Sequence, residues 1–464
     1  MRQVDKSKLV LIHEKDEFIK DVPLEGKEIG YYQDSWNRFR KNKASFVAFI
    51  VISIIMFFVL FGPSLTSYNL NRDNPIEARR LARITPKIPG LEKLGIFDGT
   101  KKMTLGKRFL NHMYHESGEI GEGIIISGYP EALKLNPNAA EYADVISFEV
   151  KVDHYKFTNY IRSYMSEDYF NTAEGGNLGP VTRSMLQSEF EEALAKNYII
   201  DVLKVQTSVD PKDPSKTYIE YHVRINQFLY AMDQTPENTY FWFGTTEKGG
   251  DLFKELWLGA RISLLLALAV TVVNAFVGIF LGSFAGYYGG VFDLLFDRFV
   301  EIIGSLPFLT ILTLLVLRFG SAAWVIVLAF TLNGWIGSYY MSRMQFYRFK
   351  NREYVLAAKT LGAGDRRIMF KHIFPNTLGY MVTSYALAIP AFVFTESTYS
   401  FLGIINYSNV TSVGLLIKTG QENMSLYPHL LLFPSIYISI LMIAFNVLGN
   451  GLRDAFNPAL RGVE

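Results

Sequence analysis

The sequence contains no cysteine, and this absence excludes disulfides, thiolate metal sites and cysteine nucleophiles. It also lacks a GxxxxGK[ST] loop, so the chain cannot hold a nucleoside triphosphate in the manner of P-loop proteins. Its seven histidines are scattered, without the HExxH spacing of a zinc site. The net charge is only +2 over 464 residues, which argues against a nucleic-acid-binding protein. We therefore expect neither a metal nor a nucleotide to be bound by this chain.

Charge is also nearly absent from six long apolar runs, which contain a single acidic residue, Glu301. Each run approaches the about 20 residues that a helix needs to cross about 30 Å of hydrocarbon. So many uncharged runs are unsuited to the core of a soluble protein, and we predict an all-α membrane protein with six transmembrane helices. The runs cover residues 45–62, 262–281, 299–317, 321–341, 377–395 and 431–449.

Basic residues flank these runs unevenly, and their distribution predicts the orientation of the chain. Lysines and arginines gather before the first run, in the loop 343–376 and in the tail 451–464. The positive-inside rule places all three in the cytoplasm, so both termini are expected inside. Residues 1–44 form a long segment of mixed charge and no cleavage site follows, so the first helix (45–65) is expected to be an uncleaved anchor.

A polar block, residues 66–240, separates the first helix from the other five, which we place within 241–450. The block is too long for a plain loop and has its own periodicity. Residues 182–198 have helical spacing, whereas 143–157 and 215–228 alternate as strands do. We predict an inserted α+β domain outside the cytoplasm.

A bent, basic segment lies between the fourth and fifth runs. Residues 353–361 favour a helix, and Gly362 with Gly364 is expected to end it as a left-handed cap. Asp365 is placed to cap the N-terminus of a second short helix, residues 366–373. Pro375 is then expected to stop that helix before the fifth span.

The second helix has one apolar side, which suits two locations. A short amphipathic helix at the cytoplasmic face fits a groove in a partner protein. It equally fits the headgroup layer of the membrane. The spacing of the residues leaves both open. The apolar side comprises Leu361, Ile368, Met369, Ile373 and Phe374.

This segment resembles the cytoplasmic EAA loop of bacterial ABC importer permeases, whose coupling helix docks on an ATPase subunit. The family pattern, EAA, then Gly, then a hydrophobic residue and Pro, is matched at 356–358, 362 and 373–375. Leu356 stands where the family has Glu, and Glu353 lies a turn earlier. The resemblance implies a docking site made of Glu353, Leu356, Ala357, Ala358, Gly362, Gly364, Asp365, Arg366, Arg367, Ile373 and Pro375.

Further motifs resemble the C-type subunit of oligopeptide and dipeptide permeases. They are DSWNRFRKNKASFVAFIVI, FGTTEKGGDLFKELWLGARISLLLAL, AGYYGGVFD, TESTYSFLGI and AFNVLGNGLRDAFNPALR. In the second motif, Thr246 and Gly250 replace the usual Asp and Arg of the family. The similarity covers residues 34–70 and 241–461, so the block 71–240 stands out as an insertion.

The resemblance implies a fold of the type I importer class and a role as half of a peptide translocation pathway in the bacterial cytoplasmic membrane. The implied partners are a second homologous permease, two cytoplasmic ATPases that use ATP and Mg²⁺, and an extracytoplasmic peptide-binding lipoprotein. This chain would hold no catalytic residue and no cofactor. Nickel complexes, glutathione and antimicrobial peptides are alternative substrates within the same architecture, and a membrane-anchored receptor is the rival outside it.

Two asparagines lie within the expected spans. Asn274 and Asn333 either line a polar pathway for a peptide backbone or join helices by hydrogen bonds, and the second interpretation is favoured. The four-residue spacing of Gly278, Gly282 and Gly286 predicts close helix packing.

Overall fold

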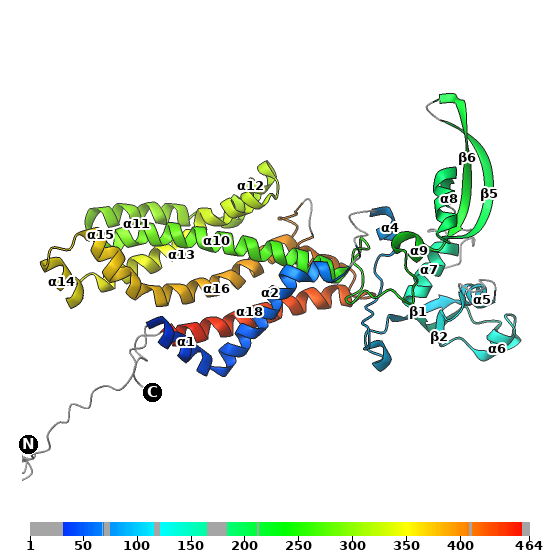
Figure 1. The fold of residues 1–464 in the computed structure, drawn as a ribbon, viewed down its shortest axis with the longest axis horizontal. Coiled ribbons are helices and arrows are strands. Elements are labelled where there is room, and N and C mark those ends of the chain that lie inside the picture. Colours follow the sequence, from blue (N-terminus) through cyan, green and yellow to red (C-terminus); the bar gives the residue numbers. More distant parts are fainter. Residues whose placement is uncertain are drawn as a thin grey trace, which may run out of the picture.

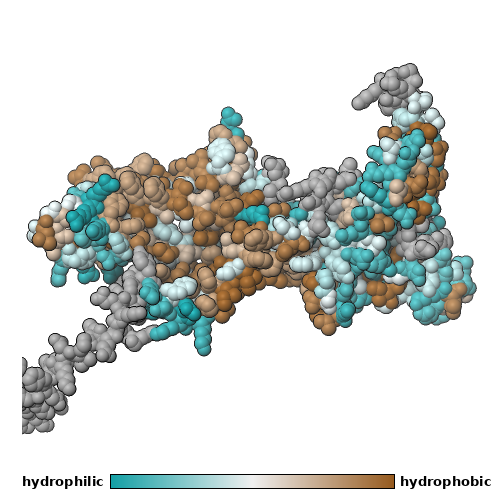
Figure 2. Space-filling model, viewed as in Figure 1, coloured by the Kyte–Doolittle hydropathy of each residue, from teal (hydrophilic) through white to brown (hydrophobic). Residues whose placement is uncertain are grey.

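The computed structural model describes residues 31–66, 68, 75–115, 121–164, 183–210, 213–407 and 411–456. The expected N-terminal segment up to residue 30 and the tail beyond residue 456 lie outside these ranges. A helical bundle occupies one end of the elongated molecule and the inserted region occupies the other (Figure 1). On the face seen in Figure 2, hydrophobic residues cover the middle of the bundle, while hydrophilic residues gather at both ends.

Long helices form the bundle because their residues are apolar over whole turns, without the alternation that a strand requires. Several end at glycines, such as Gly320 after α12, whose φ of 78° suits a helix end. The bundle helices are α1 (Tyr31–Lys41), α2 (Lys43–Leu65), α10 (Leu252–Tyr288), α11 (Gly290–Gly304), α12 (Phe308–Phe319), α13 (Ala323–Phe349), α16 (Phe374–Phe401), α17 (Val413–Glu422) and α18 (His429–Phe456).

The expected class, a helical membrane protein with an inserted α+β region, is confirmed, whereas the count of six spans is not. Four of the described helices are long and apolar enough to cross a membrane, or five if α11 and α12 form one span. These two are bent by 65° at a break that contains Pro307. The expected fourth span does form α13, but Asn333, Ser338 and two adjacent tyrosines make it less apolar than the others.

Glycines set the closest helix contact, between α10 and α13. A Cβ atom on Gly278 would lie 2.3 Å from Cβ of Ser338, and one on Gly282 would lie 2.3 Å from the Tyr339 carbonyl oxygen. Only glycine therefore fits at these positions, and the close packing predicted from the spacing is confirmed.

The inserted region contains two three-stranded antiparallel sheets, in the orders β1-β3-β2 and β4-β6-β5. The predicted strands correspond to β3 and β6, and the predicted helix to α8, which β4 precedes. Its elements are α4 (Pro75–Arg80), η3 (Glu92–Leu94), β1 (Thr100–Gly106), α5 (Lys107–His115), β2 (Ile125–Ser127), α6 (Glu131–Leu135), η5 (Ala140–Tyr142), β3 (Ser147–Asp153), α7 (His154–Tyr164), β4 (Arg183–Leu186), α8 (Gln187–Ala195), β5 (Ile199–Asp210), β6 (Asp213–Ile225) and α9 (Gln227–Met232).

The inserted region packs directly on the loops of the bundle. Phe97 of the inserted region packs on Phe433 of α18 with 5.6 Å between ring centroids. The buried ring of His154 stacks on Tyr427, and the Lys101 ammonium lies 3.5 Å from the centroid of the same tyrosine ring. Burial, with the Lys101 charge nearby, lowers the pKa of His154 to about 3, so the ring is neutral at pH 7. Aromatic packing and a neutral histidine thus join the two parts.

Candidate functional site

The candidate coupling loop lies at the end of the bundle remote from the inserted region (Figure 1). It connects α13 with α16 through α14 (Glu353–Thr360), α15 (Asp365–Arg367) and the π-helical turn η7 (Ile368–Ile373). Figure 1 shows these elements beyond the tips of the long helices, opposite to the sheets. The loop and the inserted region are therefore held at opposite ends of the hydrophobic bundle.

The bend after α14 follows the prediction at Gly362, whereas Gly364 has a φ of −70° and is not part of the left-handed cap. Gly362 has a φ of +83°, the left-handed conformation that favours glycine. The Ala363 N–H donates to the Ala358 carbonyl and the Gly362 N–H donates to the Lys359 carbonyl, each at 3.0 Å. This pair of bonds is a Schellman motif, which satisfies the last carbonyl groups of the helix.

The second helix differs from the prediction in two respects. Asp365 does not cap it, because Gly364 occupies the N-cap position and the Asp365 carboxylate accepts a 2.6 Å hydrogen bond from the Tyr287 hydroxyl. Pro375 does not stop it either, because η7 runs directly into α16 and Pro375 lies in the first turn of α16. Proline is tolerated there because the π turn before it already departs from the i→i−4 hydrogen-bond pattern that a proline would break.

The back of the loop is anchored in a small apolar core. Val355, Ile368 and Ile373 are buried together with Met369 of η7 and Phe346 of α13. At the rim of this core, the Lys350 ammonium donates to the Gly286 carbonyl of α10 at 3.0 Å. The apolar side predicted for the second helix thus largely faces the bundle, and Ile373 is not available to a partner.

The front of the loop combines apolar and basic side chains. Leu361 is 89% exposed, Leu356 50% and Phe370 48%. Beside Phe370 a shallow groove of about 760 Å³ is lined by Gly364, Asp365, Arg366, Arg367, Lys371 and Pro375. Glu353 and Ala357 are exposed on α14, and Ala358 is half-buried.

Sequence reasoning missed two parts of this front surface. Leu361 was assigned to the same side as residues that prove to be buried, and Phe370 was not singled out. At the α-helical angle of 100° per residue, the side chain of Phe370 would point away from those of Ile368 and Met369. The π turn changes the angle between successive residues, so α-helical spacing does not predict which of these side chains is exposed.

The two asparagines meet in a cavity of about 390 Å³ within the bundle, bounded by α10, α12, α13 and α16. The Asn333 Nδ2 atom donates to the Leu306 carbonyl at 3.1 Å. Among the described residues, the Oδ1 atoms of Asn274 and Asn333 are buried without a hydrogen-bond partner. Asn333 therefore joins two elements, while amide oxygens remain available at the cavity.

Comparison with known proteins agrees with this arrangement. Residues 278–462 match the family model "Binding-protein-dependent transport system inner membrane component". Residues 30–82 match "N-terminal TM domain of oligopeptide transport permease C". Most of the inserted region, from residue 83 to residue 240, lies between these two ranges.

Three curated relatives are each similar to about half of this chain. The Bacillus subtilis oligopeptide transport system permease protein OppC is 38% identical over 50% of this chain and 76% of its own length. The dipeptide permease protein DppC of the same organism is 37% identical over 58% of this chain and 82% of its own length. OppC of Escherichia coli K12 is 36% identical over 50% of this chain and 80% of its own length. The chain belongs to the family of binding-protein-dependent permeases that includes these proteins, and it is the multi-pass membrane component of such a transporter, not its ATPase.

Proposed function

We propose that this chain is a permease subunit of an ATP-driven importer of oligopeptides or dipeptides. It forms half of the translocation pathway beside a second, similar permease. Two ATPases bind at the loop end, and an extracytoplasmic peptide-binding lipoprotein delivers substrate at the other end. One observation carries the proposal: the coupling loop and the inserted region occupy opposite ends of one hydrophobic bundle (Figures 1 and 2).

Coupling follows from the anchored back and the open front of the loop. Because Val355, Ile368 and Ile373 pack against α13, a push on α14 moves the long helices with it instead of bending the loop. The exposed Leu356 and Leu361 supply the apolar contact that a groove in an ATPase would bury. Rigid-body motion then switches the side to which the pathway opens.

The two ends of the helical bundle also support an orientation of the chain in the membrane. The end of α18 and the beginning of α1 lie toward the loop end of the bundle (Figure 1), which supports the proposal that both termini are on the side of the coupling loop. That side carries Arg366, Arg367 and Lys371, as the positive-inside rule requires of the cytoplasmic face. The inserted region then lies outside the cell.

The direct experiment is purification of the tagged chain from its own bacterium in mild detergent. We expect a second permease and two ATPases to copurify, and the complex to hydrolyse ATP. The single subunit, purified alone, should show no ATP turnover, since it has no P-loop. A chain that remains alone and still transports peptide into proteoliposomes would contradict the proposal.

We infer that the asparagine cavity contacts the substrate. Amide groups can exchange hydrogen bonds with a peptide backbone, which is common to all peptides. Replacing both Asn274 and Asn333 by Leu should raise the KM for peptide uptake about tenfold, the loss of one to two hydrogen bonds. The matched control is Asn446→Leu, since Asn446 is exposed on α18 and its amide donates to the Met442 carbonyl of the same helix. Loss of assembly with unchanged KM would assign the two asparagines to helix packing alone.

We further infer that the inserted region docks the delivered binding protein. Its β5–β6 hairpin projects away from the bundle (Figure 1), and Val202, Val205 and Ile219 on it are exposed. Gln206 pairs with Glu220 in this hairpin, so residues 207–219 can be replaced by Asn-Gly without changing the register below. The shortened hairpin should weaken binding of the loaded binding protein at least about tenfold, as loss of an interface hot spot does.

A second variant separates docking from a passive spacer role. Replacement of residues 71–240 by a flexible linker removes the whole region, and assembly with the second permease is measured beside binding-protein affinity. If both variants bind the loaded protein with unchanged affinity, the docking role is wrong. If assembly also survives, the region is only a spacer.

A further inference from the structure

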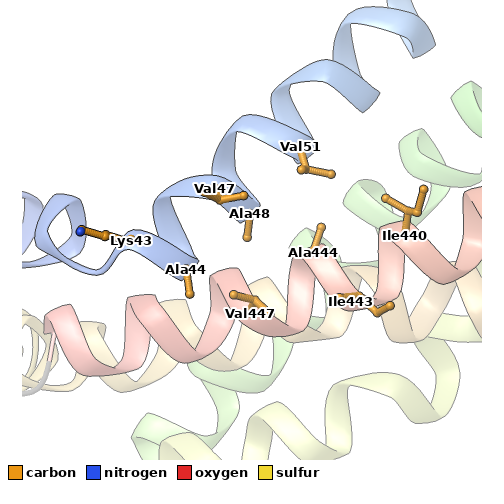
Figure 3. Close-up of a pocket in the computed structure, with 9 residues that line it drawn as sticks. All are labelled: Lys43, Ala44, Val47, Ala48, Val51, Ile440, Ile443, Ala444 and Val447. Carbon is orange, nitrogen blue, oxygen red and sulfur yellow. The ribbon is translucent and has the colours of Figure 1, made fainter.

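An apolar groove lies between α2 and α18, outside the cavity and the loop described above. Its volume is about 530 Å³, within the range of roughly 300–1,000 Å³ typical of small-molecule sites. Figure 3 shows Val47 and Val51 of α2 facing Ile440 and Ala444 of α18 across it, with Lys43 at one end. Apart from Lys43, every residue that lines the groove is Ala, Val or Ile.

The groove arises from the way in which the two helices meet. At the start of α2, Ser45 Oγ donates to the Val447 carbonyl at 3.3 Å, and a Cβ atom on Gly451 would collide with Ser45. Farther along, the helices diverge, as Figure 3 shows. The small side chains of Ala48 and Ala444 leave this diverging space unfilled.

Aromatic residues indicate the depth of the Lys43 end in the membrane. Trp36 of α1 stacks on Phe39 at 5.6 Å, and both rings lie 6.3 Å from Phe49 of α2. An exposed Trp such as Trp36 beside a hydrophobic helix is typical of the interface between hydrocarbon and headgroups. Lys43, the first residue of α2, therefore lies at the level of the lipid headgroups.

We propose that this groove binds one acyl chain of an anionic phospholipid, whose phosphate is held by Lys43. The charge of Lys43 matches an anionic headgroup, and basic sites between membrane helices are known to select such lipids. From Lys43 to Val51 the helix rises about 12 Å, close to the about 15 Å of one hydrocarbon leaflet. A peptide does not suit the groove, because no polar side chain lies along it to pair with its backbone.

The test compares two lipids on the membrane complex purified in mild detergent. Phosphatidylglycerol and phosphatidylcholine with identical acyl chains are added, and native mass spectrometry counts the lipid retained per copy of this chain. We expect phosphatidylglycerol to be retained about fivefold better, because the Lys43 cation lies at the headgroup end of the groove. Phosphatidylglycerol with a photoreactive acyl chain should label residues 44–51 or 440–447.

Two substitutions separate the chain site from the headgroup site. Val47→Trp, at the exposed rim, should block the groove and abolish retention of both lipids without disturbing the buried floor. Lys43→Gln should remove the preference for phosphatidylglycerol, and Lys43→Arg should keep it. The matched control is Ile54→Trp, since Ile54 is similarly exposed on α2 but does not line the groove.

Three results would overturn the proposal. Retention by Val47→Trp equal to that of the unchanged protein would place the lipid elsewhere. Equal retention of the two lipids by the unchanged protein would exclude the headgroup site. A photoreactive residue at position 47 that crosslinks to the second permease instead of lipid would show that a protein helix fills the groove.

Discussion

The Gly362→Val variant is expected to lose most of its peptide uptake while still inserting in the membrane. Gly362 has a φ of +83°, and a β-branched residue in that conformation costs of order 1–3 kcal/mol. Such a cost lowers the equilibrium constant for forming the bent loop about 5- to 150-fold. The loop that remains cannot present α14 at the right angle, so ATPase activity should also lose its response to the loaded binding protein. Uptake and ATPase activity are measured in proteoliposomes.

Two glycine substitutions control this experiment. Gly364→Ala should be nearly neutral, because Gly364 has a φ of −70° and no atom lies within 4 Å of an added Cβ. Gly362→Asn should be intermediate, since asparagine tolerates the left-handed region better than valine. Normal uptake by Gly362→Val at an unchanged amount of protein would refute the coupling role of the bend. Equal damage from Gly364→Ala would show that the segment is merely intolerant of any change.

The second large effect is expected at the front of the loop. Leu356 replaces the glutamate of the family pattern and is half exposed, so we infer that an apolar groove of the ATPase covers it. Leu356→Glu would bury an unpaired carboxylate there, which costs several kcal/mol. The Kd of the ATPase for this chain should rise at least about 100-fold, because each 1.4 kcal/mol changes the Kd by a factor of ten. Leu361→Glu, on the more exposed neighbour, should act in the same direction.

The matched control for these substitutions lies in the inserted region. Leu194→Glu changes a leucine on α8 that is 56% exposed, close to the 50% of Leu356, at the other end of the molecule. It should leave ATPase binding unchanged. Binding is measured by copurification and by the affinity of the ATPase for the permease complex immobilised on a surface. If Leu356→Glu binds the ATPase as well as or better than the unchanged protein, position 356 faces a polar environment and the carboxylate of the family pattern is tolerated there.

Local patterns sufficed for the parts of the loop that depend on neighbouring residues. The helix after Glu353 and the left-handed bend at Gly362 were predicted because capping is decided within a few residues. Asp365 was predicted to be a cap for the same local reason. Its carboxylate instead bonds the hydroxyl of Tyr287, which is 78 residues away and which no local pattern brings there.

The number of spans shows a similar limit. Composition identified apolar runs, but α13 is less apolar than its neighbours and α11 is bent away from α12. The polar residues of α13 are accommodated because Gly278 and Gly282 let α10 approach closely, and because Asn333 faces a cavity. The residues that accommodate the polar side chains of α13 lie on other helices. The hydropathy of one contiguous segment therefore does not reveal them.

The sequence by itself determined that this is a membrane protein of the binding-protein-dependent permease family with an inserted α+β region, because hydropathy, strand alternation and family motifs are properties of contiguous residues. Only the tertiary structure decided which side of the coupling loop is open. Ile368 and Leu361 are similarly apolar, yet Ile368 is buried against Phe346 while Leu361 is 89% exposed. Burial depends on what other helices place beside a residue, and that information is distributed over the whole chain.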